Sequence, residues 1–454
     1  MKRLLTVSIV AVLNVVLLSC TKINEDAGSE PDADGYVSEY AVPIDSALLY
    51  LSDFIQSGEV TRSSALKIEN IQVVKRSKVA TRMSYNNEDM LYLVKFAENQ
   101  GSAVLAADSR IDAPVLALLD EGAFIPDDFE DPGYNDPNNL IINVDGEDFN
   151  LYCAAEDDYY IGGPNDEASQ RGLVASMIES YAVNSIENSS GGGSKYQRRG
   201  NGEIIQSNLM LRTKWHQGSP FNDLTPIKRG QRSPAGCVAV ALAQIMAYHE
   251  YPRNLTCNGV PCNWNEMKNY SILNPSVGAI PLANFLSVLG VSLKMWYGKN
   301  NAFATPQNAK NTMLFFGYSN VKKKLGYNGG TILSMIDEGN PVFIGALSGI
   351  TGGGHAWVID GYKYVGSRNI TRADRDIYYG RRVGDGSYQV NRNTLLVHCN
   401  WGWGGASNGY YASGVFNIKD GPLEYGDYDT QDDSGNKGNY NWWFRILTYD
   451  NPNQ

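Results

Sequence analysis

Hydrophobic residues recur with two different spacings along this chain, and the two spacings predict where helices and strands lie. Apolar residues three to four positions apart predict helices at residues 45–57, 168–186, 237–251 and 331–338. Short apolar runs bounded by Gly, Asn, Asp or Pro predict strands at residues 71–79, 90–96, 102–107, 342–347, 356–364 and 394–401. In the second half of the chain the helix comes first and the strands follow, which predicts an α+β fold.

The first twenty residues have the pattern of an export signal. Lys2 and Arg3 precede an almost unbroken apolar run, residues 4–18, which is shorter than a membrane-spanning helix requires. The run ends at Ser19-Cys20, a small residue directly before a cysteine, as in a bacterial lipobox. We expect cleavage before Cys20, a lipid on its thiol, and a location in the cell envelope, at the outer membrane or cell surface. An ordinary signal peptide with an incidental cysteine is the alternative.

Charge and flexibility place one domain boundary near the middle of the chain. Residues 1–199 hold 15 Lys and Arg against 32 Asp and Glu, a net charge of −17. Residues 200–454 hold 23 against 17, a net charge of +6. The sign changes within a Gly- and Ser-rich stretch, residues 189–202, in which the basic segment 195–199 is a candidate processing site. The imbalance predicts two modules that attract each other, although a solvated acidic surface explains it equally well.

Composition excludes several classes of protein. The 454 residues are 43% apolar and 19% charged, as in globular proteins and unlike fibrous or disordered ones. No Lys/Arg-rich stripe occurs in the basic half beyond residues 322–324, so nucleic-acid binding is not expected. Cys257 and Cys262 could form a local disulfide, whereas a zinc site would need a second pair or a nearby histidine. We therefore expect neither a metal nor a cofactor.

Cys237 is the candidate nucleophile. It follows Gly236 and begins an Ala-rich helix, where the positive end of the helix dipole favours the thiolate. A nucleophilic thiol needs a base within hydrogen-bond reach. His249 cannot be that base, because it lies 12 residues along the same helix, about 18 Å away at about 1.5 Å per residue. A buried cysteine that merely starts a core helix is the alternative.

His355 is the best candidate for the base. It follows three glycines and begins an apolar strand, so a rigid element would hold it at an exposed end. His216, at the start of a polar loop, is a second candidate, and His398, inside an apolar strand, is expected to be a core residue. Asn400 could orient the imidazole, and Gln217 could donate an amide N–H to an oxyanion. Taken alone, these last two residues are weak signals, since Asn and Gln are common in turns and loops.

Four motifs, in order along the chain, resemble those of the streptopain family of papain-clan bacterial cysteine peptidases. They are WHQGSPFN at 215–222, AGCVA at 235–239 with AQIMAYHEYP at 243–252, GHAWVIDG at 354–361, and NWGWGG at 400–405 with NGY at 408–410. The resemblance implies a papain-like peptidase in which Cys237 attacks the scissile carbonyl and His355 transfers protons. It also implies that Gln217 stabilises the oxyanion and that Asn400 or Trp401 positions the imidazole.

The resemblance extends to the first half of the chain. Residues 92–124 and the helix at 168–186 resemble the family's inhibitory propeptide, a smaller α+β module ahead of the peptidase domain. The implied organisation is a lipoprotein signal peptide at 1–19, a tether at 20–35, a propeptide at 36–188, a linker with the processing site at 189–202, and a peptidase domain at 203–454. The acidic, turn-rich stretch at 127–158, which we expect to be an insertion or a long loop, departs from the family pattern.

The expected function is that of a secreted or surface-anchored cysteine endopeptidase, made as a zymogen and acting on proteins or peptides through a Cys–His dyad. Its own propeptide would be its intramolecular inhibitor, and the lipid at Cys20 its link to a membrane. Two alternatives stay open. A papain-like cell-wall amidase would release peptidoglycan without cleaving protein. A non-catalytic surface lipoprotein that binds host protein or glycan would carry an unreactive Cys237.

Overall fold

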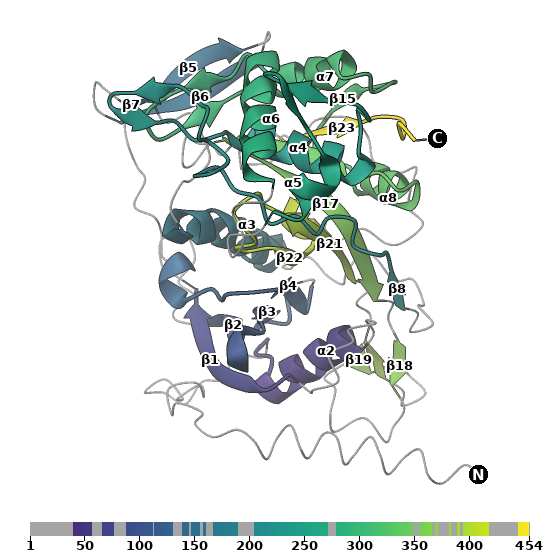
Figure 1. Cartoon of the computed structure of the whole chain (residues 1–454). Coiled ribbons are helices and arrows are strands. Elements are labelled where there is room, and N and C mark those ends of the chain that lie inside the picture. Colours follow the sequence, from purple (N-terminus) through teal and green to yellow (C-terminus); the bar gives the residue numbers. More distant parts are fainter. Residues whose placement is uncertain are drawn as a thin grey trace, which may run out of the picture. The chain divides into compact units, whose positions relative to one another are not determined.

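The computed structural model divides the chain into two compact units. The residues that it describes are 40–56, 66–76, 88–111, 113–129, 139–144, 147–154, 158–159, 167–188, 204–270, 278–347, 354–365, 368–370, 381–382, 388–390, 394–416 and 444–453. Unit 1 comprises Met1–Glu130, Ala175–Ile205 and Tyr364–Thr394, and unit 2 comprises Asp131–Val174, Gln206–Lys363 and Leu395–Gln454. Helices and strands occur in both units (Figure 1), so the predicted α+β class is confirmed. The predicted signal peptide, tether and linker at 189–202 lie outside the described residues.

Unit 1 is built on a four-stranded sheet in the order β1-β2-β3-β4. The strands, each antiparallel to its neighbour, are β1 (Ile68–Lys75), β2 (Asp89–Phe96), β3 (Ser102–Ala106) and β4 (Val115–Leu119). Helix α2 (Ile44–Gln56) contacts β3. Its buried residues Ala47, Leu51 and Phe54 recur at helical spacing, which is the pattern that predicted the helix.

Unit 2 contains a sheet with the strand order β22-β21-β17-β16-β23-β15. The strands are β22 (Gly409–Ala412), β21 (Thr394–Asn400), β17 (Gly354–Val365), β16 (Val342–Leu347), β23 (Arg445–Thr448) and β15 (Lys322–Leu325). Strands β16, β17 and β21 are apolar runs without polar–apolar alternation, and every described position of β21 is buried. Such a pattern is typical of strands covered on both faces, so this sheet lies in the interior of the unit.

Helix α4 (Cys237–His249) is the central helix of unit 2. It contacts α6, α7 and β16, and of its side chains only that of Tyr248 is exposed. A helix that is apolar all round is a core helix. The other helices of this unit are α5 (Trp264–Lys268), α6 (Ala279–Ser292), α7 (Pro306–Phe315) and α8 (Gly329–Asp337).

The remaining helices and strands include three short hairpins. Three two-stranded hairpins are β9 (Ile227–Lys228) with β10 (Gln231–Arg232), β11 (Thr256–Cys257) with β12 (Val260–Pro261), and β13 (Trp296–Tyr297) with β14 (Ala302–Phe303). The others are α3 (Glu167–Asn188), β5 (Asn139–Val144), β6 (Glu147–Ala154), β7 (Asp158–Tyr159), β8 (Ile204–Gln206), β18 (Arg368–Ile370), β19 (Arg381–Arg382) and β20 (Tyr388–Val390). Within the described ranges, no helix combines the length and the apolar character that crossing a membrane requires.

The acidic stretch at 127–158, expected to be an insertion or a long loop, contains strands, which corrects the long-loop alternative and leaves the insertion as a prediction. It contains the antiparallel pair β5 and β6, in which Val144 lies opposite Glu147. The missed signal is Asp145-Gly146 between two runs that carry apolar residues. Asp-Gly favours the two-residue turns that close hairpins, and the high acidic content of the stretch obscured this.

Candidate active site

Cys237 is the first residue of α4, and the glycine before it determines how the chain enters the helix. Gly236 has a φ of 93°, in the region that favours glycine. A Cβ at this position would lie 2.7 Å from Met295 Cε and 3.3 Å from Ala302 Cβ. The sharp turn therefore requires glycine, and it brings Cys237 to the end of the helix where unpaired N–H groups and the dipole favour a thiolate. The Cys237 side chain is buried.

His355 lies near the start of β17 and is held by a backbone carbonyl. Its Nε2 lies 2.8 Å from the carbonyl oxygen of Trp401. Because a carbonyl can only accept, Nε2 carries the hydrogen, and Nδ1 of the neutral ring is left with a lone pair. Nδ1 is buried and has no hydrogen-bond partner among the described residues. The imidazole is thus oriented on one side and ready to accept a proton on the other.

Three indole rings surround this imidazole. The ring centroid of His355 lies 4.4 Å from that of Trp403 and 6.1 Å from those of both Trp357 and Trp401. Burial among these groups lowers the pKa of His355 to about 4, and the hydrogen bond to Trp401 partly opposes that shift. At neutral pH the ring is therefore uncharged, which is the form that a general base needs.

Asn400 and Trp401, the two predicted positioning residues, make different contacts. Of these two residues, Trp401 contacts the imidazole, through its carbonyl oxygen and its ring. The Asn400 side chain donates to the carbonyl oxygen of Thr213 at 2.9 Å and accepts from Gln244 Nε2 and Gly402 N, both at 3.2 Å. Asn400 therefore ties α4 to the segment that carries Trp401.

Gln244 and Trp357 were not singled out by the sequence reasoning, whereas the indoles of Trp401 and Trp403 were expected to shield the hydrogen bond of the imidazole from water. Gln244 is fully buried in α4, accepts a hydrogen bond from Thr213 Oγ1 at 2.8 Å and donates to Asn400. The available signal was a glutamine among the apolar residues of a core helix, because a buried amide must be hydrogen-bonded. Trp357 was visible as an aromatic residue, but nothing in its spacing showed that its ring would stack with that of His355.

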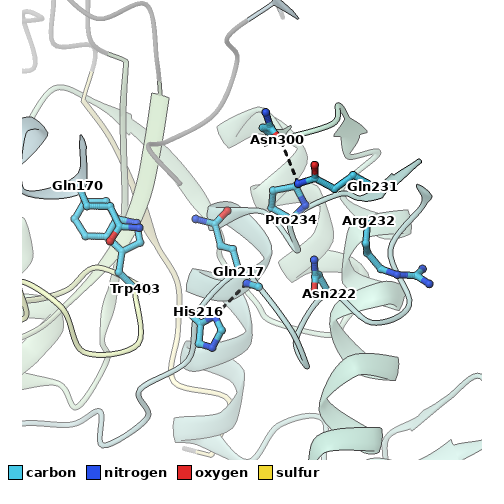
Figure 2. A pocket seen from close by; sticks show the side chains of 10 residues that line it. Gln170, His216, Gln217, Asn222, Gln231, Arg232, Pro234, Asn300 and Trp403 are labelled. Carbon is cyan, nitrogen blue, oxygen red and sulfur yellow. Dashed lines mark hydrogen bonds between the residues drawn. The ribbon is translucent and has the colours of Figure 1, made fainter. Parts of the chain in front are cut away.

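A cavity of about 370 Å³ adjoins these groups, and all of its lining residues belong to unit 2. Figure 2 shows Gln217 between Trp403 and Pro234. The carbonyl of Gln217 accepts a hydrogen bond from Ala235 N at 2.8 Å, so the predicted oxyanion loop is joined to the segment that leads into Cys237. The cavity wall thus combines Pro234, three residues before Cys237, with Trp403, which packs on the imidazole of His355.

The remaining histidines are occupied elsewhere. His216 Nδ1 accepts from Gly218 N at 3.1 Å, and burial lowers its pKa. His249 Nε2 lies 3.3 Å from the Tyr449 hydroxyl, at the far end of α4. His398 is buried with its Nδ1 2.6 Å from Asp360 Oδ1, so its predicted place in the core is confirmed.

The described residues include neither a metal site nor the predicted lipid attachment site. In the part of the chain that the structure describes, no three His, Cys, Asp or Glu side chains gather as a metal site would require. Cys20, the predicted lipid attachment site, lies outside the described residues.

Comparison with known proteins adds independent information. Residues 215–411 match the family model described as "Peptidase C10 family". Streptopain of Streptococcus pyogenes is 26% identical over 298 residues, which cover 55% of this chain and 66% of that protein, just under two thirds of its length. The "Thiol protease/hemagglutinin PrtT" of Porphyromonas gingivalis is 26% identical over 240 residues, which cover 45% of this chain and 23% of that protein.

Among solved structures, a prointerpain A fragment of Prevotella intermedia is similar, with a TM-score of 0.47 and 17% identity over 83% of this chain and 98% of that one. The range of the family match, 215–411, contains Gln217, Cys237, His355 and Trp401. The resemblance to the streptopain family that the four motifs predicted is confirmed, since residues 215–411 match the peptidase C10 family model and streptopain is a detected relative.

Proposed function

We propose that this chain is the zymogen of an exported cysteine endopeptidase whose catalytic dyad is Cys237 and His355. The observation that carries the proposal is the state of the imidazole. Its Nε2 is fixed on the Trp401 carbonyl, and its Nδ1 is buried and without a partner among the described residues. A cysteine at a helix N-terminus in the same unit supplies the proton that such a base takes up.

In the acylation step, Nδ1 of His355 accepts the thiol proton and the Cys237 thiolate attacks the scissile carbonyl carbon of a protein or peptide. Negative charge develops on the carbonyl oxygen, where the Gln217 amide and the backbone N–H of Cys237 donate hydrogen bonds. His355 then gives its proton to the leaving amine, the C–N bond breaks, and an acyl-enzyme thioester remains.

In the deacylation step, His355 takes a proton from water, which attacks the thioester and releases the acid product and the thiol. The Trp401 carbonyl keeps Nε2 protonated in both steps, so the ring presents the same nitrogen to the substrate throughout. The indoles of Trp357, Trp401 and Trp403 exclude water from that hydrogen bond, and a less polar surrounding strengthens it.

The acidic first half of the chain is proposed to be the inhibitor of this enzyme. Opposite net charges of the two halves, −17 for residues 1–199 and +6 for residues 200–454, favour their association. A second support is Gln170 of α3, within the predicted propeptide, because it lines the same cavity as Gln217 and Trp403. A propeptide side chain in that cavity would occupy space that a substrate needs.

Processing is proposed within residues 189–202, near 195–199. The segment that follows is bound to β17: Ser207 N donates to the Tyr362 carbonyl at 3.0 Å, and Met210 N to the Asp360 carbonyl at 3.1 Å. Residues from Ser207 onward therefore stay with the peptidase when the linker is cut. Since the proposed lipid at Cys20 lies on the other side of the cut, cleavage would release the peptidase from the membrane.

The test is casein hydrolysis by the processed protein, with iodoacetamide labelling of Cys237. Both Cys237→Ala and His355→Ala should lower kcat/KM by at least about 10³-fold while the thermal unfolding of the protein is retained. Cys262→Ser is the matched control, since it removes a buried thiol that the proposed mechanism does not use and should leave casein hydrolysis at room temperature unchanged. Undiminished hydrolysis by Cys237→Ala would refute the proposal.

A further inference from the structure

Two cysteines that the proposed mechanism does not use share one face of the β11–β12 hairpin. Cys257 lies opposite Val260 in the ladder, and Thr256 lies opposite Pro261. The pairing continues by one more position, since Cys262 N donates to the Leu255 carbonyl at 2.8 Å. Cys257 and Cys262 are therefore diagonal neighbours two positions apart, and side chains at that spacing point to the same side.

The two thiols are in contact and shielded from solvent. Cys257 is 1% exposed and Cys262 5% exposed, and their side chains are hydrogen-bonded to each other. That hydrogen bond and burial raise the pKa of Cys257, whereas the same hydrogen bond lowers the pKa of Cys262. Since a thiolate is the group that attacks a disulfide, the lowered pKa favours Cys262 as the attacking residue.

The turn between the two strands holds the thiols in this register. Asn258 and Gly259 both have positive φ, 49° and 77°, as a two-residue type I′ turn requires. Asn258 Nδ2 donates to Asn284 Oδ1 at 3.2 Å, and the Cys262 thiol points to the Pro281 carbonyl, so the hairpin packs on α6. The turn and its contacts with α6 leave little freedom for the hairpin to separate the two sulfur atoms.

We propose that Cys257 and Cys262 form a disulfide bond when this protein folds in an oxidising compartment. In the structure both are free thiols in contact, and the bond requires the sulfur atoms to approach to about 2.05 Å. The bond forms during folding, before the hairpin is closed off from solvent.

The oxidant is a disulfide of a thiol–disulfide oxidoreductase, or oxidised glutathione in vitro. The Cys262 thiolate attacks one sulfur of that disulfide, forms a mixed disulfide and expels the other sulfur as a thiolate. The Cys257 thiolate then attacks the Cys262 sulfur and expels the second sulfur of the oxidant. Two electrons and two protons pass from the cysteine pair to the oxidant, which leaves as two thiols.

Peptide mapping of the unaltered sequence tests the bond directly. Arg253 and Lys268 flank one tryptic peptide, residues 254–268, that contains both cysteines and no other. The protein is exported to a bacterial periplasm, purified without reductant, and alkylated in denaturant before digestion. We expect this peptide to be unalkylated and lighter by two hydrogens than its reduced form, and to take up two alkyl groups only after reduction. Two alkyl groups without reduction would overturn the proposal.

Thermal unfolding tests the consequence of the bond. The measurement is made on full-length Cys237→Ala. This variant lacks the Cys237 thiol, so the result does not depend on the proposed peptidase activity. Closing this short loop should raise Tm, and a reductant should lower it again by about 4–8 °C. The triple variant Cys237→Ala/Cys257→Ser/Cys262→Ser should show no reductant-dependent shift. An equal shift in both proteins would contradict the assignment.

Discussion

The buried pair of Asp360 and His398 offers a sharp test of how the peptidase unit is held together. Asp360 on β17 is fully buried; its Oδ1 lies 2.6 Å from His398 Nδ1, and its Oδ2 accepts from Leu211 N at 2.9 Å. One carboxylate thus joins β21 and the segment that leads to Gln217. The change Asp360→Asn keeps the size of the side chain but replaces one acceptor oxygen with a donor.

The expected loss follows from these two contacts. If the amide oxygen of the new Asn faces His398, its NH₂ group faces the N–H of Leu211, so two buried donors meet without an acceptor. An unsatisfied buried donor costs about 1–3 kcal/mol, and the lost charge-assisted bond to His398 about 1.5–3 kcal/mol. We therefore expect the free energy of unfolding to fall by about 3–5 kcal/mol.

The assay is thermal and urea unfolding of the full-length chain with and without Asp360→Asn. Both proteins carry Cys237→Ala, so that no proteolysis occurs. Asp337→Asn is the matched control. Asp337, at the end of α8, is exposed and accepts one hydrogen bond, at 2.8 Å, from Tyr362, which lies on β17 as Asp360 does. The free energy of unfolding of this control should fall by less than about 1 kcal/mol. Hydrogen exchange at Leu211 should accelerate only in Asp360→Asn. A loss no larger than that of the control would refute the reasoning.

Three further predictions concern the site, and a fourth concerns His249 at the far end of α4. Gly236→Ala should destabilise the protein by about 1–3 kcal/mol, measured by urea unfolding, because of its positive φ and the adjacent side chains; a loss below 0.5 kcal/mol would contradict it. Gln217→Ala should lower kcat by about 10²–10³-fold with a smaller change in KM; a change confined to KM would exclude the oxyanion role. Trp403→Ala should expose His355 and raise its pKa from about 4, which moves the acidic limb of the pH–rate profile to higher pH; an unmoved limb would contradict this. Burial also lowers the pKa of His249 from 6.5 to about 4. The unfolded chain therefore binds a proton at this residue more readily than the folded one, so the stability that the neutral ring contributes is complete above pH 6.5 and is lost as the pH falls toward 4. The stability of His249→Gln should fall less steeply with acid than that of the unaltered protein.

The parts of the site that could be predicted from the sequence depend on local chemistry. Gly236 before Cys237 and an Ala-rich run after it define a helix that starts at a thiol, and α4 begins at that residue. Likewise, three glycines ahead of His355 and an apolar run after it predict a strand with a histidine near its start, as in β17. Turn residues and periodicity act over a few neighbouring positions, so one sequence is enough to read them.

Contacts between distant segments could not be predicted in this way. From the sequence, either Asn400 or Trp401 could hold the imidazole. Side-chain chemistry points to the amide of Asn400 and gives no reason to choose a backbone carbonyl. In the structure the carbonyl of Trp401 makes that contact, while Asn400 bonds to Thr213 and Gln244. Every residue has a carbonyl, so no residue type marks the one that will accept.

The sequence by itself determined the α+β class, the resemblance of residues 215–411 to a peptidase family and the choice of the candidate dyad, since these follow from local periodicity and from motifs of a few residues. Only the tertiary structure decided that Nδ1 of His355 has no hydrogen-bond partner among the described residues and which groups surround the ring. The same holds for the Asp360–His398 pair and for the contact of Cys257 with Cys262. The physical reason is that pKa, burial and hydrogen-bond partners depend on groups that are distant along the chain and adjacent only after folding.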